Sequence, residues 1–198
     1  MTRIVAGSAK GRTLAVPKSG TRPTSERVRE ALFSRLDHMN VLEGATVLDL
    51  YAGTGALGLE ALSRGGTHAT LVEKASTAAR VVTAEARTYL GARSGEALAG
   101  DIDLVFIDPP YDIAEDDMTT VLSCLGPWIG PDALVVVERS TRAPAPTWPD
   151  FLVLEDQRTW GETVAYLAGP PLPKDETGDV ARALADAPAS SHAQEEER

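Results

Sequence analysis

The stretch that decides the fold is Leu104-Val-Phe-Ile-Asp-Pro-Pro-Tyr111. An apolar run that ends in two prolines predicts a buried strand, because proline has no N–H to donate to a β-ladder. We therefore expect Asp108 at the carboxyl end of this strand, which is the edge where open parallel α/β sheets bind ligands. The two prolines restrict the backbone and make the next residues a rigid bend. The alternative is a plain exit from a strand into a loop, with Tyr111 on the surface.

On both sides of this stretch, apolar runs alternate with helical patterns. Buried strands are predicted at residues 47–50, 68–73 and 133–138, and helices at residues 56–64 and 114–125. Residues 151–157 and 163–168 predict a hairpin that closes the sheet. This alternation predicts an α/β fold with a mostly parallel sheet and a C-terminal antiparallel hairpin.

The amino-terminal residues add a second, smaller unit to this pattern. Residues 3–18 predict a β-hairpin, and the helix that follows has Thr24 as its expected N-cap. Apolar residues at helical spacing, from Val28 to Leu36, are expected to face the body of the protein. The arginines of this region are then expected at the rim or in solvent: Arg22, Arg27, Arg29 and Arg35.

Composition indicates one globular domain with no membrane segment. The 198 residues are 43% hydrophobic and 24% charged, which is ordinary for a globular protein. Cys124 is the single cysteine, so no intrachain disulfide can form and a reducing cytoplasm is expected. No apolar run reaches membrane-spanning length, and the amino terminus does not resemble a signal peptide.

Charge is distributed unevenly along the chain. The net charge is −10, yet residues 1–40 contain eight Lys or Arg against three Asp or Glu, a net of +5. Residues 41–169 contain eight against nineteen, a net of −11, and residues 170–198 contain three against seven, a net of −4. A basic segment at residues 1–40 of an otherwise acidic protein predicts a local phosphate-binding surface. A solvated, arginine-rich helix face is the alternative.

The glycine-rich segment Gly53-Thr-Gly-Ala-Leu-Gly58 follows one predicted strand and begins a helix. With Glu73 twenty residues after Gly53, it also satisfies the dinucleotide-binding fingerprint. Asp49 favours a different cofactor, because a carboxylate beside this turn repels a pyrophosphate but attracts the ammonium and sulfonium of S-adenosylmethionine. Glycines let the backbone approach the cofactor closely, and Glu73 can accept hydrogen bonds from ribose hydroxyls in either case.

The two motifs are expected to meet, because strands that end at Asp49 and Asp108 would be neighbours at the switch point of the sheet. Asp-Pro-Pro-Tyr in this place resembles the signature of amino-methyltransferases, which methylate an exocyclic base nitrogen. Hydrogen bonds from that amine to the Asp108 carboxylate and the Pro109 carbonyl would favour its nucleophilic geometry. The Tyr111 ring would stack on the base, and positioning would supply much of the catalysis.

The sequence resembles the RsmD family of bacterial 16S rRNA (guanine-N2)-methyltransferases over residues 3–168. The block Arg22-Pro-Thr-Ser-Glu-Arg-Val-Arg-Glu-Ala-Leu-Phe33 is specific to this family rather than to methyltransferases in general. The other matching motifs are residues 3–7, 11–12, 49–64, 72–73 and 108–111. The resemblance implies a Rossmann-like S-adenosylmethionine-dependent methyltransferase fold at 41–169. Residues 1–40 are expected to form a basic hairpin-helix extension, and residues 170–198, which are rich in proline, acid and alanine without periodicity, are expected to form a flexible acidic tail.

The resemblance also implies the roles of individual residues. The target amine is expected at Asp108, Pro109, Pro110 and Tyr111, and the target is a flipped or unpaired guanine. S-adenosylmethionine is expected at Asp49, Tyr51, Gly53, Gly55 and Glu73. RNA, held within an assembling small subunit, is expected at Lys10, Arg12, Arg22 and Arg27. We expect a monomer.

One segment departs from the family pattern. The interval between Glu73 and the strand that leads to Asp108 is short, so a helix or strand between residues 74 and 102 is expected to be curtailed, with Glu85 as a candidate on the adenine side. A non-catalytic RNA-binding assembly factor, with cofactor binding impaired by this short segment, therefore stays open. A DNA amino-methyltransferase that acts on adenine N6 or cytosine N4 is a second alternative, disfavoured because the sequence shows no separate target-recognition domain. His38, His68 and His192 are scattered and have no cysteine partners, which disfavours a metal site.

Overall fold

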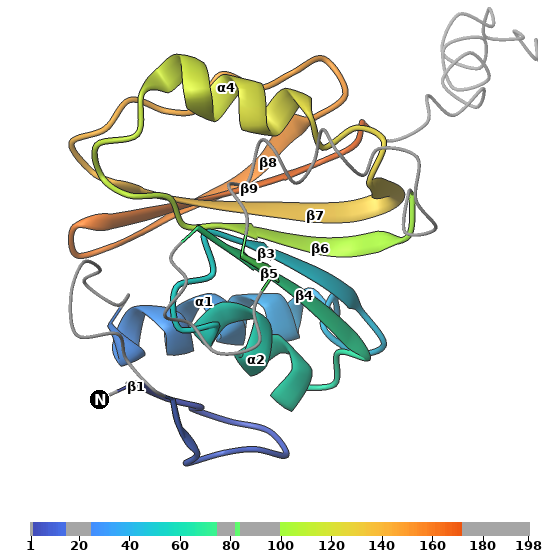
Figure 1. The fold of residues 1–198 in the computed structure, drawn as a ribbon, viewed down its shortest axis with the longest axis vertical. Helices are drawn as coiled ribbons and strands as arrows, with labels where there is room; N and C mark the ends of the chain where they lie inside the picture. Colours follow the sequence, from blue (N-terminus) through green and yellow to red (C-terminus); the bar gives the residue numbers. More distant parts are fainter. Residues whose placement is uncertain (1, 15–24, 75–81, 84–99, 172–198) are drawn as a thin grey trace, which may run out of the picture.

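The computed structural model describes residues 2–14, 25–74, 82–83 and 100–171. The described part contains a seven-stranded sheet and a separate two-stranded sheet at the amino terminus. Helices α1 (Glu26–His38) and α2 (Ala56–Ser63) cover one face of the large sheet, and α4 (Glu115–Ser123) covers the other (Figure 1). The predicted α/β class is confirmed.

The large sheet has the strand order β5-β4-β3-β6-β7-β9-β8. Its strands are β3 (Thr46–Leu50), β4 (His68–Glu73), β5 (Val82–Thr83), β6 (Ile102–Ile107), β7 (Ile129–Ser140), β8 (Val153–Trp160) and β9 (Thr163–Gly169). The first five strands in this order run parallel, whereas β9 is antiparallel to both β7 and β8. The predicted parallel sheet with a C-terminal hairpin is therefore present.

Two apolar clusters fill the space between the sheet and the helices, because successive side chains of a strand point to opposite faces. Val105 and Ile107 of β6 pack in the cluster beneath α4, where Trp128 is also buried. Leu104 and Phe106, the alternate residues of the same strand, pack in the cluster beneath α1 and α2. The central strand β6 is thus buried on both sides, which explains why it is almost wholly apolar, whereas the edge strand β8 is mostly exposed and carries polar residues.

The amino-terminal hairpin is present between β1 (Thr2–Arg3) and β2 (Thr13–Leu14), which pair antiparallel. The N-cap of α1 is Ser25 rather than the predicted Thr24, since the Ser25 hydroxyl accepts a hydrogen bond from the Val28 N–H at 3.2 Å. Thr24 itself lies outside the described residues.

The predicted exposure of Arg29 is wrong. Its side chain is 1% exposed, because it lies on the apolar face of α1 and forms an ion pair with the fully buried Glu60 of α2. Arg27 is exposed as predicted, and Arg35 is half-buried in an ion pair with Asp156 of β8.

The segment expected to be curtailed still contributes an edge strand. Val82 and Thr83 pair in parallel with Val72 and Glu73, so β5 is only two residues long. Glu85 lies outside the described residues, as do residues 75–81 and 84–99. No helix of the described part is long and apolar enough to cross a membrane.

Candidate active site

The two sequence motifs meet at the carboxyl edge of the sheet. Strands β3 and β6 are adjacent and parallel, with Leu50 level with Ile107. Tyr51 and Asp108, the residues that follow, therefore leave the sheet side by side. The prediction that these two strands are neighbours is confirmed, and it places the glycine-rich turn beside Asp-Pro-Pro-Tyr.

The glycine-rich turn adopts a backbone that requires glycine. Gly53 and Gly55 have φ angles of 54° and 75°, and Gly55 is the N-cap of α2. A Cβ on Gly55 would also lie 2.9 Å from Cδ1 of Leu71 in β4. Tyr51 has a φ of 65°, which is uncommon for a residue with a side chain. The turn is thus tightly constrained where a cofactor is expected to approach it.

Glu73, at the end of β4, braces this turn. Its Oε2 accepts a hydrogen bond from the Gly53 N–H at 2.8 Å. The two residues, which lie twenty positions apart in the sequence signature, are therefore in direct contact in the structure. The contact places a carboxylate at the tip of the strand next to β3, which is where an acceptor for ribose hydroxyls was predicted.

Asp49 is a buried carboxylate beneath the turn. Its Oδ2 accepts a hydrogen bond from the Gly58 N–H at 2.9 Å, and its Oδ1 has no hydrogen-bond partner among the described residues. The pKa of Asp49 is raised to about 7, chiefly by burial; the Gly58 hydrogen bond opposes this rise, and the charges of Asp108 and Glu73 add to it. Burial without a cation disfavours the carboxylate, and a positive charge close to Asp49 would favour it.

Asp-Pro-Pro-Tyr forms the bend that was predicted after β6. Asp108 is half-buried and Pro109 is buried, whereas Pro110 is exposed. The Pro110 carbonyl accepts a hydrogen bond from the Ile113 N–H at 3.1 Å, which turns the chain toward α4. Tyr111 is 71% exposed, so its ring is available to an incoming base. This exposure also agrees with the alternative of a plain surface tyrosine.

The predicted RNA-binding residues lie on the amino-terminal unit. Lys10 and Arg12 are exposed in the loop between β1 and β2, and Arg27 is exposed in the first turn of α1. Arg22 lies outside the described residues. The roles assigned to these residues and to the cofactor and target residues remain predictions.

Sequence reasoning missed Glu138 near this edge. Val137 of β7 is level with Ile107 of β6, so Glu138 follows at the height of Asp108, and it is buried. Burial lowers the pKa of Arg29 in α1, and the negative charge of Glu138 opposes this shift. The sequence does contain a signal for Glu138. It follows the apolar run of residues 133–137, as Asp108 follows the apolar run of residues 104–107.

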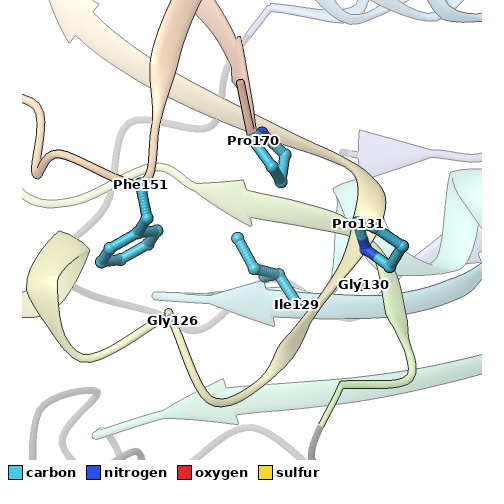
Figure 2. A pocket seen from close by; sticks show the side chains of 6 residues that line it. All are labelled: Gly126, Ile129, Gly130, Pro131, Phe151 and Pro170. Atoms are coloured by element: carbon cyan, nitrogen blue, oxygen red, sulfur yellow. The ribbon is translucent and has the colours of Figure 1, made fainter. Parts of the chain in front are cut away.

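A separate pocket of about 300 Å³ lies at the beginning of β7. Figure 2 shows its lining residues, Gly126, Ile129, Gly130, Pro131, Phe151 and Pro170. Because Ile129 is level with Ile102 at the start of β6, this pocket is at the opposite end of the strands from Asp108. It is not part of the candidate site.

Within the described ranges, no group of three or more His, Cys, Asp or Glu side chains could hold a metal ion.

Comparisons with known proteins identify the family of this chain. Residues 2–168 match the family model described as conserved hypothetical protein 95. The chain is 38% identical to ribosomal RNA small subunit methyltransferase D of Escherichia coli over 181 residues, which cover 83% of this chain and 87% of the relative.

Solved structures show the same fold. The Escherichia coli protein yhhF, whose name describes it as a methyltransferase, has a TM-score of 0.70 at 33% identity and covers 86% of this chain and 98% of its own. SMU.776, described as a methyltransferase complexed with SAH, has a TM-score of 0.54 at 12% identity over 70% of this chain and 49% of its own, a likeness of fold alone. The fold is that of S-adenosylmethionine-dependent methyltransferases, and the chain belongs to the conserved hypothetical protein 95 family, which is the RsmD family.

Proposed function

We propose that this protein transfers a methyl group from S-adenosylmethionine to the exocyclic N2 amine of a guanine in small-subunit (16S) rRNA, within a ribosomal assembly intermediate. The observation that carries the proposal is the adjacency of β3 and β6, which places the turn above Asp49 beside Asp108. The relatives named as small subunit methyltransferase D support rRNA as the substrate.

The residues beneath and around the turn fit the cofactor. When bound, S-adenosylmethionine supplies a methyl group on a sulfonium that carries positive charge. Asp49 and Glu73 place carboxylates at this edge of the sheet, which favours such a ligand over a pyrophosphate. The Asp49 Oδ1, unpaired among the described residues, offers an acceptor for an ammonium group. Gly53 and Gly55 would let the backbone approach the cofactor closely, and Tyr51 lies in the same turn.

The target side fits an aromatic amine. A guanine amine is a weak nucleophile, because its lone pair is conjugated with the ring. The Asp108 carboxylate and the Pro109 carbonyl would accept its two N–H groups and stabilise the positive charge that develops on nitrogen. Tyr111, exposed beside them, would stack on the base. Such a base must leave its stack or be unpaired to reach this edge.

The basic amino-terminal unit supports an RNA partner. Lys10, Arg12 and Arg27 are exposed, and Arg22 belongs to the same basic segment of the sequence. Lysine and arginine side chains neutralise phosphates with little dependence on sequence, so they would hold the rRNA while Asp108 to Tyr111 select the base. We propose that the protein works as a monomer, and an rRNA substrate agrees with the cytoplasmic location predicted from the sequence.

Methyl transfer to undermethylated small subunits tests this function. With labelled S-adenosylmethionine, we expect the wild-type protein to yield N2-methylguanosine after digestion of the rRNA. Asp108→Ala should lower the rate by about a hundredfold or more, since it removes a transition-state acceptor. Its affinity for S-adenosylmethionine, measured by calorimetry, should stay close to that of the wild type.

Three results would overturn parts of this proposal. Equal loss of cofactor binding and activity in Asp108→Ala would show that Asp108 holds the cofactor instead. Label that enters DNA but not rRNA would identify a DNA amino-methyltransferase. Undetectable binding of S-adenosylmethionine by the wild type would favour the non-catalytic assembly factor.

A further inference from the structure

The loop between β1 and β2 packs against the second half of α2, and it presents two of the proposed RNA-binding cations. Backbone hydrogen bonds close the loop, from the Ile4 N–H to the Arg12 carbonyl and from the Gly11 N–H to the Ile4 carbonyl, both at 2.9 Å. Lys10 and Arg12 are exposed on it. How this loop is attached to α2 therefore decides where those cations lie.

Glu60 of α2 is the main attachment point. Its carboxylate is fully buried, and its Oε2 and Oε1 accept hydrogen bonds from the Val5 and Ala6 N–H groups at 2.7 and 2.9 Å. Oε1 also accepts from Nε of Arg64 at 2.8 Å, and Nε of the buried Arg29 lies 3.8 Å from Oε2. Arg29 in turn donates to the Arg3 carbonyl of β1. A buried carboxylate that receives two backbone N–H groups from a distant segment is a specific anchor.

Ser63, one turn further along α2, continues the attachment. Its carbonyl accepts from the Ser8 N–H at 2.7 Å, and its hydroxyl accepts from the Ala9 N–H at 2.9 Å. The contact is so close that a Cβ on Gly7 would lie 1.8 Å from the Ser63 carbonyl oxygen. The loop thus meets α2 through its backbone and leaves the Lys10 and Arg12 side chains on the outside.

We propose that Glu60 is a positioning residue for the rRNA substrate: it fixes the loop that bears Lys10 and Arg12 on the helix that starts at the cofactor turn. This inference rests on the proposed function. Because α2 begins after Gly55, the basic loop and the cofactor turn are attached to one short helix. A loop ordered before binding loses less conformational freedom when it engages phosphates, so the two cations contribute more to affinity.

The first test replaces Glu60 with glutamine and measures three quantities separately. The single amide oxygen cannot replace both carboxylate oxygens, so we expect Glu60→Gln to weaken binding to undermethylated small subunits by about tenfold and to reduce the salt slope by about two. Affinity for S-adenosylmethionine and kcat at saturating subunits should be unchanged. In a Lys10→Ala/Arg12→Ala background, Glu60→Gln should weaken subunit binding no further.

A second pair of variants leaves the buried charges in place, in case Glu60→Gln does not fold. Gly7→Ala inserts a Cβ into the contact with Ser63 and should weaken subunit binding as Glu60→Gln does. Gly44→Ala is the matched control, because Gly7 and Gly44 have φ angles of +79° and +77° but Gly44 has open space around its Cβ position. The control should bind subunits and cofactor like the wild type.

The outcomes separate the two proposals. A wild-type protein that neither binds nor methylates small subunits overturns the proposed function. If the wild type does both, then unchanged subunit affinity in Gly7→Ala and Glu60→Gln overturns the positioning role alone. A fall in cofactor affinity parallel to the fall in subunit affinity, or a full effect of Glu60→Gln in the Lys10→Ala/Arg12→Ala background, also overturns it.

Discussion

Asp49 is the residue whose chemistry is most altered by its surroundings. It is 1% exposed, and burial together with Asp108 and Glu73 raises its pKa to about 7. A bound cation favours the carboxylate, so affinity for S-adenosylmethionine should rise with pH through about 7 and binding below that pH should release a proton. Calorimetry in two buffers of different ionisation enthalpy measures this release. Asp49→Asn should bind more weakly and without pH dependence.

The same pKa determines a change in stability. In the unfolded chain Asp49 ionises at its ordinary pKa of 3.8, whereas in the folded protein it stays protonated up to about pH 7. Between these two pH values the folded state therefore binds more protons than the unfolded state. The contribution of Asp49 to the free energy of unfolding falls as pH rises across that window. Comparing wild type with Asp49→Asn by denaturant unfolding isolates this contribution. Identical pH dependence of the two proteins, in stability and in cofactor affinity, would contradict the raised pKa.

At the scale of one element, α1 shows what a helical pattern can and cannot predict. Leu32, Phe33 and Leu36 lie at helical spacing and are buried as expected. Arg29 stands three residues before Leu32 and shares their face, so its burial agrees with the helical spacing although we expected it at the rim or in solvent. The residue type argued against it, because an arginine is seldom buried without a partner. Its ion-pair partner Glu60 comes from α2, which the sequence of α1 does not show.

Matched substitutions in α1 test this assignment. Arg29→Met should lower the free energy of unfolding by about 3–5 kcal/mol, because it leaves the buried Glu60 charge with less compensation. Arg27→Met, two residues away and exposed, should change it by no more than about 0.5 kcal/mol. Urea denaturation measures both values. Similar losses in the two variants would show that Arg29 is not the buried partner of Glu60.

For the whole molecule, the α/β class and the adjacency of the strands that carry Asp49 and Asp108 were predictable from the alternation of apolar runs and helical patterns. Parallel strands bring their carboxyl ends to one edge of the sheet. The packing of the amino-terminal loop was not predictable, because Glu60 has the sequence context of an ordinary helix acid. Its burial depends on contacts with Val5 and Ala6, more than fifty residues away. Long-range contacts of this kind leave no local pattern.

The proposed activity of this protein is methylation of N2 of one guanine in small-subunit rRNA. The most direct measurement is mass-spectrometric mapping of methylated nucleosides in rRNA from cells with and without this gene. We predict that deletion removes a single N2-methylguanosine from the small-subunit rRNA, that the wild-type gene restores it, and that Asp108→Ala does not. An unchanged methylation map in the deletion strain, or restoration by Asp108→Ala, would contradict the claim.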